Sequence, residues 1–494
     1  MSIPEWAKKH QQKGTTIETH KTKQGTTNYY LRKITSKYNK QKKRAQKISG
    51  PYLGKITPQG LIPPKHQQTK KTTDPTKITT KEHGATQLIL NTNQQTIQHL
   101  KTHYPNHYKE ITTTAIFRLI HNTPLKNADF YYQTSNLTQT LPNTDIKNKT
   151  IGPLLRKIGL QRETINTFLQ HYIQNAEHIA VDLTHVFSLS ENIISATLGH
   201  NNKGEFAPQL NLFFLFSLDH MMPAYFRVLI GSIPSAKALK LSIKESRAKN
   251  VVLVGDKGFF SDANVEALEQ DGLSYVLPLK RNLKLIDYAV LKTGDKARFG
   301  EFFRFEKRII WFYEYRVGGR RVIVFLDEGL GVEEQKDILG RIDEDRLGGK
   351  DVDERLDEFY VDQFRLGTVA VVTNLLDVLA CEVYGFLKAR VEIEQMYDSF
   401  KNVLHADRMY MRDDYQVEGW MFINFVALLF YYQLRNMLVE RGLLGRYSVN
   451  DILVHLSRIY KLKVDGDWVI SEIPKKSRQI LEKLDPHITK NLQS

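Results

Sequence analysis

The chain has 494 residues, of which 41% are hydrophobic and 25% are charged, and its net charge is +16. This length and composition fit a soluble globular protein of about two to four domains. A single cysteine, Cys381, excludes an internal disulfide framework and a cysteine-based zinc site, so a reducing cytoplasm is the expected location. The most apolar run, residues 421–434, is too short to span a bilayer, and the N-terminus lacks the apolar core of a signal peptide. No membrane association is therefore expected.

The basic residues are concentrated in the first part of the chain. Residues 1–180 carry 28 Lys and Arg against 9 Asp and Glu, whereas the remaining 314 residues carry 42 against 45. This excess predicts a polyanionic partner, and nucleic acid rather than a membrane, because no basic amphipathic helix with a strong apolar face stands out. The alternative is a basic arm that is exposed to solvent and binds no polyanionic partner.

Residues 1–82 are rich in Lys, Thr, Gln and Gly and predict a small basic module with a linker. Short strands are expected at residues 29–34 and 52–56, with a basic turn at 37–47 between them. The Pro/Thr/Lys-rich stretch at residues 63–80 is typical of a linker.

Residues 83–177 change to helical spacing, interrupted by Pro105, Pro124 and Pro142. A compact basic helical domain of this kind commonly binds duplex DNA through its phosphates, although no helix-turn-helix motif is clear. The expected helices are residues 86–103, 108–121, 151–158 and 162–174.

An α/β core is expected to begin at residue 178, where Val, Leu, Gly, Asp and Arg replace the Lys, Asn, Gln and Thr of the preceding region. Asp182 lies in an apolar first strand, and VVLVGDKGFF reads as a buried strand that ends at Asp256. The order of elements matches a ribonuclease-H-like topology. Between and after these strands we expect strands at residues 210–218, 224–230 and 274–279 and helices at 235–249 and 262–270.

Asp182 and Asp256 would lie on neighbouring strands of an open mixed sheet, at the edge where ligands tend to bind. A buried aspartate without a partner is costly, so Asp182 calls for a cation or a hydrogen-bond network. A turn-forming role is the alternative for Asp256 and fits Asp182 poorly.

Residues 285–378 interrupt this core, which is expected to cover residues 178–284 and 379–440. Alternating apolar residues predict an inserted β-rich subdomain. A C-terminal helical region, residues 441–494, would follow the core. In the insertion, we expect a helix at residues 333–343 and strands at 303–316, 320–326 and 365–373. After the insertion, we expect an apolar helix at residues 418–438 and further helices at 448–459 and 475–484.

Residues 384–401 predict a helix on which Arg390, Glu394 and Lys401 lie within about 40° of one another, beside an apolar stripe. A carboxylate between two cations suits a metal site that also holds an anionic substrate. Glu392 points roughly 160° away from Glu394, toward solvent. The alternative is an ordinary surface pair of Arg390 with Glu394.

These segments resemble the DDE transposases of bacterial and archaeal insertion sequences, in the branch whose third acid lies in a Tyr-Arg-Glu-Lys signature. The resemblance covers residues 179–434, and the spacing of Arg390, Glu394 and Lys401 reproduces the signature. At the position expected for the tyrosine the chain has Leu387, and Tyr384 lies about one turn earlier. The motifs are VDLTHV, GSIPS, VGDKGFFS, RVEIEQMYDSFK and EGWMFINFVALLFYYQL.

The resemblance implies that Asp182, Asp256 and Glu394 are catalytic and bind two metal ions. Three carboxylates without a His/Cys cluster suit Mg²⁺ or Mn²⁺. The resemblance also implies cleavage and strand transfer of double-stranded DNA, with terminal inverted repeats and target DNA as partners, and a homodimer on paired ends in the nucleoid. The residues expected to contact DNA are Arg390, Lys401, Lys257 and Tyr384.

Two other functions share these features. A ribonuclease-H-like nuclease or resolvase would use the same three acids without joining strands, but the separate basic N-terminal region and the β-rich insertion favour a transposase. An inactive, sequence-specific DNA-binding descendant is disfavoured because all three acids are present.

Overall fold

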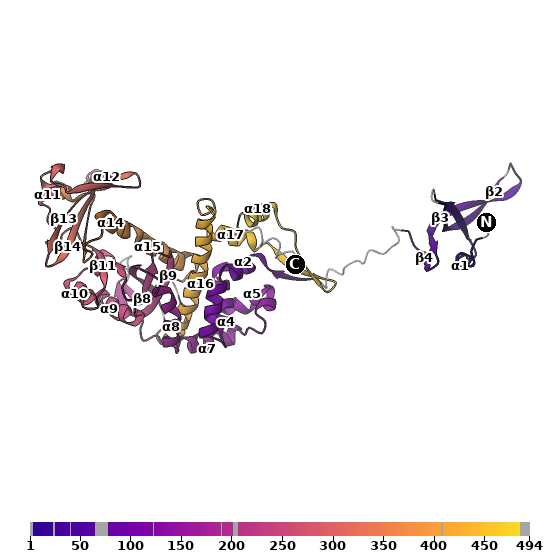
Figure 1. Cartoon of the computed structure of the whole chain (residues 1–494), viewed down its shortest axis with the longest axis horizontal. Helices are drawn as coiled ribbons and strands as arrows, with labels where there is room; N and C mark the ends of the chain where they lie inside the picture. The colour runs from indigo at the N-terminus through magenta and orange to yellow at the C-terminus, as the bar shows by residue number, and fades with distance from the viewer. Residues whose placement is uncertain are drawn as a thin grey trace. The chain divides into compact units, whose positions relative to one another are not determined.

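The computed structural model describes residues 3–22, 25–39, 41–64, 78–121, 123–188, 190–200, 206–406 and 409–484. Most of the expected linker, residues 65–77, lies outside these ranges. The chain divides into two compact units, of which the first comprises residues 1–79 and 464–467 and the second the rest (Figure 1).

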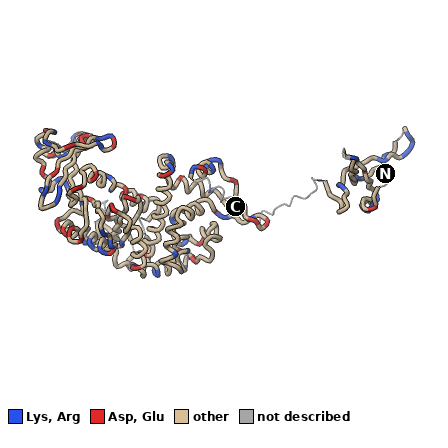
Figure 2. The backbone as a smooth tube through the Cα atoms, in the orientation of Figure 1, with Lys and Arg blue, Asp and Glu red and all other residues tan. Residues whose placement is uncertain are grey.

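The first unit is a small β structure with a basic hairpin. Its four antiparallel strands lie in the order β1-β2-β3-β4, and Ile17, Leu31 and Ile56 form its core with Ala7. Both predicted strands are present and longer than expected, and Lys and Arg gather at the β2–β3 turn (Figure 2). The elements are α1 (Glu5–Lys8), β1 (Thr15–Lys21), β2 (Thr27–Asn39), β3 (Arg44–Thr57) and β4 (Gly60–Ile62).

Near its start the second unit has helices at all four predicted places. The helix expected at residues 86–103 is instead two helices, because Asn93 leaves the helical conformation and its side-chain amide donates to the carbonyl oxygen of Ile89 at 2.9 Å. The helices are α2 (Gly84–Thr92), α3 (Gln94–His103), α4 (Tyr108–His121), α5 (Ala128–Thr134), α6 (Leu137–Thr140), α7 (Asn148–Gly159) and α8 (Arg162–Ile173).

A ten-stranded mixed sheet forms the centre of this unit. Strand β10 lies between β6 and β11 and is parallel to both. The other described pairs of adjacent strands are antiparallel. The strand order is β12-β13-β14-β15-β11-β10-β6-β8-β7, with β9 beside β8. The strands are β6 (His178–Phe187), β7 (Thr197–His200), β8 (Phe206–Ser217), β9 (Met222–Ile230), β10 (Val252–Val254), β11 (Ser274–Pro278), β12 (Glu301–Phe305), β13 (Arg308–Val317), β14 (Arg320–Asp327) and β15 (Thr368–Thr373).

The insertion contains β-strands, as expected, but its helices hold slightly more residues than its four strands, and the strands extend the core sheet. Strand β15 pairs with β11, and β14, β13 and β12 follow in order. Without β15, strand β11 would leave a row of backbone groups unpaired at a sheet edge. The helices of this region are α11 (Ala289–Lys292), α12 (Glu328–Leu347) and α13 (Asp353–Asp362).

The remaining helices pack on the sheet or on other helices. Helix α16 runs against β9, α4 and α7, and Gly419 permits the close crossing with α7, since a Cβ there would lie 2.0 Å from the carbonyl oxygen of Leu155. Strands β5, β16 and β17 form a separate three-stranded sheet. These elements are α9 (Ser235–Ser246), α10 (Asp262–Gln270), α14 (Ala380–Ala389), α15 (Val391–Asp398), α16 (Asp414–Glu440), α17 (Val449–Leu456), α18 (Lys475–Leu484), β5 (Thr79–Glu82), β16 (Tyr460–Val464) and β17 (Asp467–Ile470).

Helix α16 is also the one helix among the described residues whose length and apolar composition would allow it to cross a membrane. In the fold, 67% of its most apolar window is buried against other protein elements. That burial is typical of a core helix, so its composition is weak evidence for a membrane span.

Candidate active site

Asp182 and Asp256 lie side by side because of the register of two parallel strands. Strand β6 pairs with β10 so that Ala180 is opposite Val254. Each aspartate follows its member of that pair by two residues, and adjacent strands are about 5 Å apart. Both carboxylates therefore project at the same edge of the sheet, as the sequence predicts.

Helix α15 is held over this edge by its apolar face. Ile393, Met396 and Phe400 are fully buried, and α15 packs against β6 and β8. Phe214 of β8 is directly opposite Asp182 in the antiparallel register, so both side chains lie on the face that the helix covers. The Phe214 ring lies 5.5 Å from the ring of Tyr397 in an edge-to-face contact.

The three acids interact around one guanidinium group. Arg390, at the junction of α14 and α15, places Nη2 at 2.6 Å from Glu394 Oε1 and 3.8 Å from Asp256 Oδ1. Asp182 Oδ1 accepts a hydrogen bond from the backbone N–H of Leu183 at 2.8 Å. Burial raises the pKa of Asp182 to about 6, the charges of Asp256 and Glu394 add to this, and Arg390 opposes it.

The donor chemistry of this cluster fits a hard divalent cation. All three groups are carboxylates, and two of them already hold a cationic side chain. Among the residues that the structure describes, however, no three His, Cys, Asp or Glu side chains come together closely enough to hold a metal ion. The guanidinium of Arg390 lies near Asp256 and Glu394, so it would compete with a metal ion for these oxygens.

The two lysines predicted to contact DNA lie near the acids in different ways. Lys257 directly follows Asp256 and is exposed. Lys401 lies on the π-helical turn Ser399–Val403 that continues α15. Burial lowers the pKa of His185, a residue of β6, and the charge of Lys401 lowers it further, which places Lys401 near the same strand as Asp182.

Tyr384 is a core residue, contrary to the expected DNA contact. Its side chain is 2% exposed, and its ring lies 5.5, 5.1 and 4.9 Å from the rings of Phe303, Phe305 and Phe325. These partners belong to β12 and β14, which extend the sheet beneath α14. The ring is therefore used to pack the insertion against the core.

Glu392 also differs from the expectation that it faces solvent. Its carboxylate is partly buried and forms an ion pair with Arg435 of α16 at 3.1 Å. The helical periodicity correctly separates Glu392 from Glu394, but it does not reveal that another helix lies on that side.

The sequence reading missed Tyr397, which lies one turn after Glu394. Its hydroxyl is buried and has no hydrogen-bond partner among the described residues. Burial raises the pKa of this hydroxyl, and the charge of Asp182 raises it further, so the group lies close to the carboxylate cluster. The signal in the sequence is a polar-tipped aromatic residue within the apolar stripe of the helix.

Comparisons with known proteins identify the family to which the chain is similar. Residues 174–430 match the model of a protein family described as a transposase DDE domain. No curated protein sequence matches the chain. Among solved structures, a synaptic complex of piggyBac transposase with hairpin DNA is similar with a TM-score of 0.37 and 12% identity, covering 82% of this chain and 75% of that chain.

Proposed function

Because the chain belongs to the DDE transposase family, we propose that it is the transposase of an insertion sequence, which binds terminal inverted repeats, cuts DNA and transfers the cut strand to target DNA. The observation that carries this proposal is the convergence of Asp182, Asp256 and Glu394 on Arg390 at one sheet edge. We further infer that residues 178–284 and 379–440 form a ribonuclease-H-like catalytic core.

Asp182, Asp256 and Glu394 would hold two Mg²⁺ or Mn²⁺ ions. Such ions, when bound, activate a water molecule or a DNA 3′-hydroxyl group and stabilise the leaving 3′-oxygen. The strand register fixes the two aspartates relative to each other, and the buried face of α15 fixes the third acid. Rigid placement of this kind favours in-line attack because the reacting groups need little reorganisation.

The cations around the acids would hold the DNA backbone. Arg390 is mostly buried and already faces two carboxylates, so it is positioned to bind a phosphate at the cut. Lys401 and Lys257 would contact phosphates on either side.

Recognition of the inverted repeats would fall to the basic N-terminal regions, the module of residues 1–82 and the helices of residues 83–177. The exposed Lys42, Lys43 and Arg44 at the β2–β3 turn support this assignment. Binding through phosphates weakens steeply as salt is added. We propose that two copies act together on paired ends, in the cytoplasm at the nucleoid.

The test is an assay of Mg²⁺-dependent cleavage and strand transfer on a labelled duplex that ends in the inverted repeat flanking this gene. Nicking at the repeat boundary with joined products, absent in Glu394→Ala, is the expected result. Nicking without joining would favour a nuclease. Sequence-specific binding without any cutting would favour an inactive descendant.

A binding titration with the same labelled duplex tests the roles of the cations. Lys401→Ala and Arg390→Ala are expected to weaken binding of the repeat end by several-fold, since each removes one charge-assisted phosphate contact. Unchanged end binding in both variants would contradict their assignment. Lys336→Ala, on the distant helix α12, is the matched control for loss of a positive charge.

A further inference from the structure

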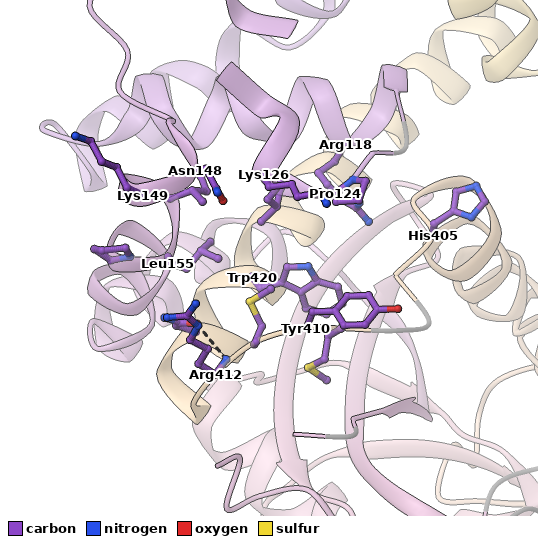
Figure 3. A pocket seen from close by; sticks show the side chains of 17 residues that line it. Arg118, Pro124, Lys126, Asn148, Lys149, Leu155, His405, Tyr410, Arg412 and Trp420 are labelled. Atoms are coloured by element: carbon purple, nitrogen blue, oxygen red, sulfur yellow. Dashed lines mark hydrogen bonds between the residues drawn. The ribbon is translucent and has the colours of Figure 1, made fainter. Parts of the chain in front are cut away.

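A pocket of about 840 Å³ opens between the N-terminal helices of the second unit and the start of α16 (Figure 3). Its walls come from α4, α7, α16 and residues 405 and 409–412, which lie between the π-helical turn of Lys401 and α16. None of the residues assigned to the acids or to the phosphate contacts lines it. The residues that line it include Arg118, Lys126, Lys149, His405, Tyr410, Arg412 and Trp420.

The charged groups that line the pocket are all basic. Lys126, Lys149 and Arg412 are exposed, and none of them makes an ion pair within the described residues. No Asp or Glu is among the described lining residues. The two acids that directly follow Arg412 are engaged elsewhere, since Asp413 pairs with Arg156 at 2.6 Å and Asp414 accepts two backbone N–H groups from residues 194 and 195. The pocket therefore favours an anion.

The pocket also offers an aromatic surface. The Tyr410 side chain is 84% exposed, whereas Trp420, which lines the same pocket, is 3% exposed. Met409 is buried beside Tyr410 in the chain, and Ile151 and Leu155 of α7 complete an apolar floor. Leaving a large aromatic ring in water forfeits the gain of burying it, so Tyr410 is available to stack on a planar ligand.

Arg118 ties this pocket to the helix that carries the third acid. Its guanidinium donates to the side chain of Asn424 at 3.0 Å, to the backbone carbonyl of Thr123 at 3.2 Å, and to the backbone carbonyl of Leu404. Leu404 directly follows the π-helical turn. The wall of the pocket is thus fixed to the end of the segment that bears Lys401.

We propose that this pocket binds an unpaired deoxynucleotide of the DNA end, with its base stacked on Tyr410 and its phosphates held by Lys126, Lys149 and Arg412. An aromatic platform among cations is the usual means of binding single-stranded nucleic acid. The volume suits a ligand of nucleotide size, and a paired base cannot enter a pocket without leaving its duplex. This inference rests on the proposed function, because it supposes a DNA substrate.

The experiment measures the affinity of the full chain for two labelled DNAs with the same repeat sequence, a blunt duplex and one with three unpaired nucleotides at the end. The wild type is expected to bind the second DNA about tenfold more tightly, which is the scale of one base stacked on an aromatic side chain. Tyr410→Ala is expected to lose that preference and to keep its affinity for the blunt duplex.

Tyr360→Ala is the matched control, because Tyr360 is also an exposed tyrosine, 60% exposed on α13, and does not line the pocket. A second readout places 5-iodouracil in the unpaired stretch and maps the photocrosslink, which is expected on the peptide that contains Tyr410. Equal affinities of the wild type for both DNAs, or an unchanged preference in Tyr410→Ala, would overturn the inference while leaving repeat binding and cleavage intact. Failure to bind either DNA would instead remove the proposed function and this inference together.

Discussion

The acidic edge, formed by Asp182, Asp256 and Glu394, and the basic pocket around Tyr410 are built in opposite ways. The acidic edge depends on strand register and on a buried helix face, so its groups are fixed by the core of the protein. The basic pocket depends on exposed side chains at helix ends and in a loop. On the proposed function, this difference means that the reaction would use rigidly placed groups, whereas DNA would be held by groups that can adapt. Substitutions in the two regions should therefore separate rate from affinity.

Asp256→Asn is expected to give the largest difference between the effect on cleavage rate and the effect on DNA affinity. Because the amide cannot replace a charged carboxylate ligand, cleavage should fall by at least about 10³-fold, as it does when one member of a catalytic group is lost. Affinity for repeat DNA, measured by a filter-binding titration, should stay within about twofold. Asp398→Asn is the control, since Asp398 lies on the same helix as Glu394 but is not part of the acidic edge. A comparable loss in the control, or lost DNA binding in Asp256→Asn, would contradict the division of roles.

The next effect concerns the packing that joins the two regions. Gly419→Ala should lower the free energy of unfolding by about 1–3 kcal/mol, because the added methyl group collides with the backbone of Leu155 where α16 crosses α7. Urea denaturation measures this loss. Gly385→Ala, in the interior of α14 with nothing within 4 Å of the added carbon, should instead be neutral or more stable by up to about 1 kcal/mol. Equal stability of the two variants would show that the helix crossing is not tight.

A second effect on stability follows from the pKa of Asp182. Burial raises that pKa to about 6, so the folded, metal-free protein binds this proton more tightly than the unfolded chain, and stability falls as pH rises from about 4 to about 6. In EDTA, Asp182→Asn should therefore be more stable than the wild type at pH 7.5 by up to about 3 kcal/mol, and the difference should vanish below about pH 4. Thermal unfolding across this pH range measures it. If Asp182→Asn is less stable than the wild type at pH 7.5, then neighbouring groups already stabilise the charged carboxylate of Asp182.

The smallest effect is expected from Tyr397→Phe. The buried hydroxyl has no partner among the described residues, so its removal should leave stability unchanged or raise it by up to about 1 kcal/mol. Chemical denaturation of the metal-free protein provides the measurement. Phe400→Leu, which removes ring contacts on the same face, should be destabilising and serves as the comparison. A clear loss of stability in Tyr397→Phe would reveal a hydrogen bond to the acidic edge.

The acidic edge was accessible from the sequence because each of its parts carries a local signal. Asp182 interrupts an apolar strand, Asp256 ends another, and Glu394 lies beside the apolar stripe of a helix. The family follows from their order and is confirmed, whereas the catalytic roles of the individual residues remain predictions.

The features that the sequence did not reveal depend on contacts between distant segments. Tyr384 is buried because the insertion joins the sheet through β15 and β11, a pairing that no local pattern specifies. The basic pocket combines residues near positions 126 and 149 with the loop before α16, almost 300 residues later. Glu392 has a partner only because α16 lies beside α15.

The most direct test of the central claim is a crystal structure of the protein with repeat DNA and Mn²⁺, with anomalous diffraction measured at the manganese edge. The account predicts anomalous peaks among the carboxylates of Asp182, Asp256 and Glu394, with Arg390 turned from the acids to a DNA phosphate. Manganese bound elsewhere, with Arg390 still paired to Glu394 and no peak at the acidic edge, would contradict it.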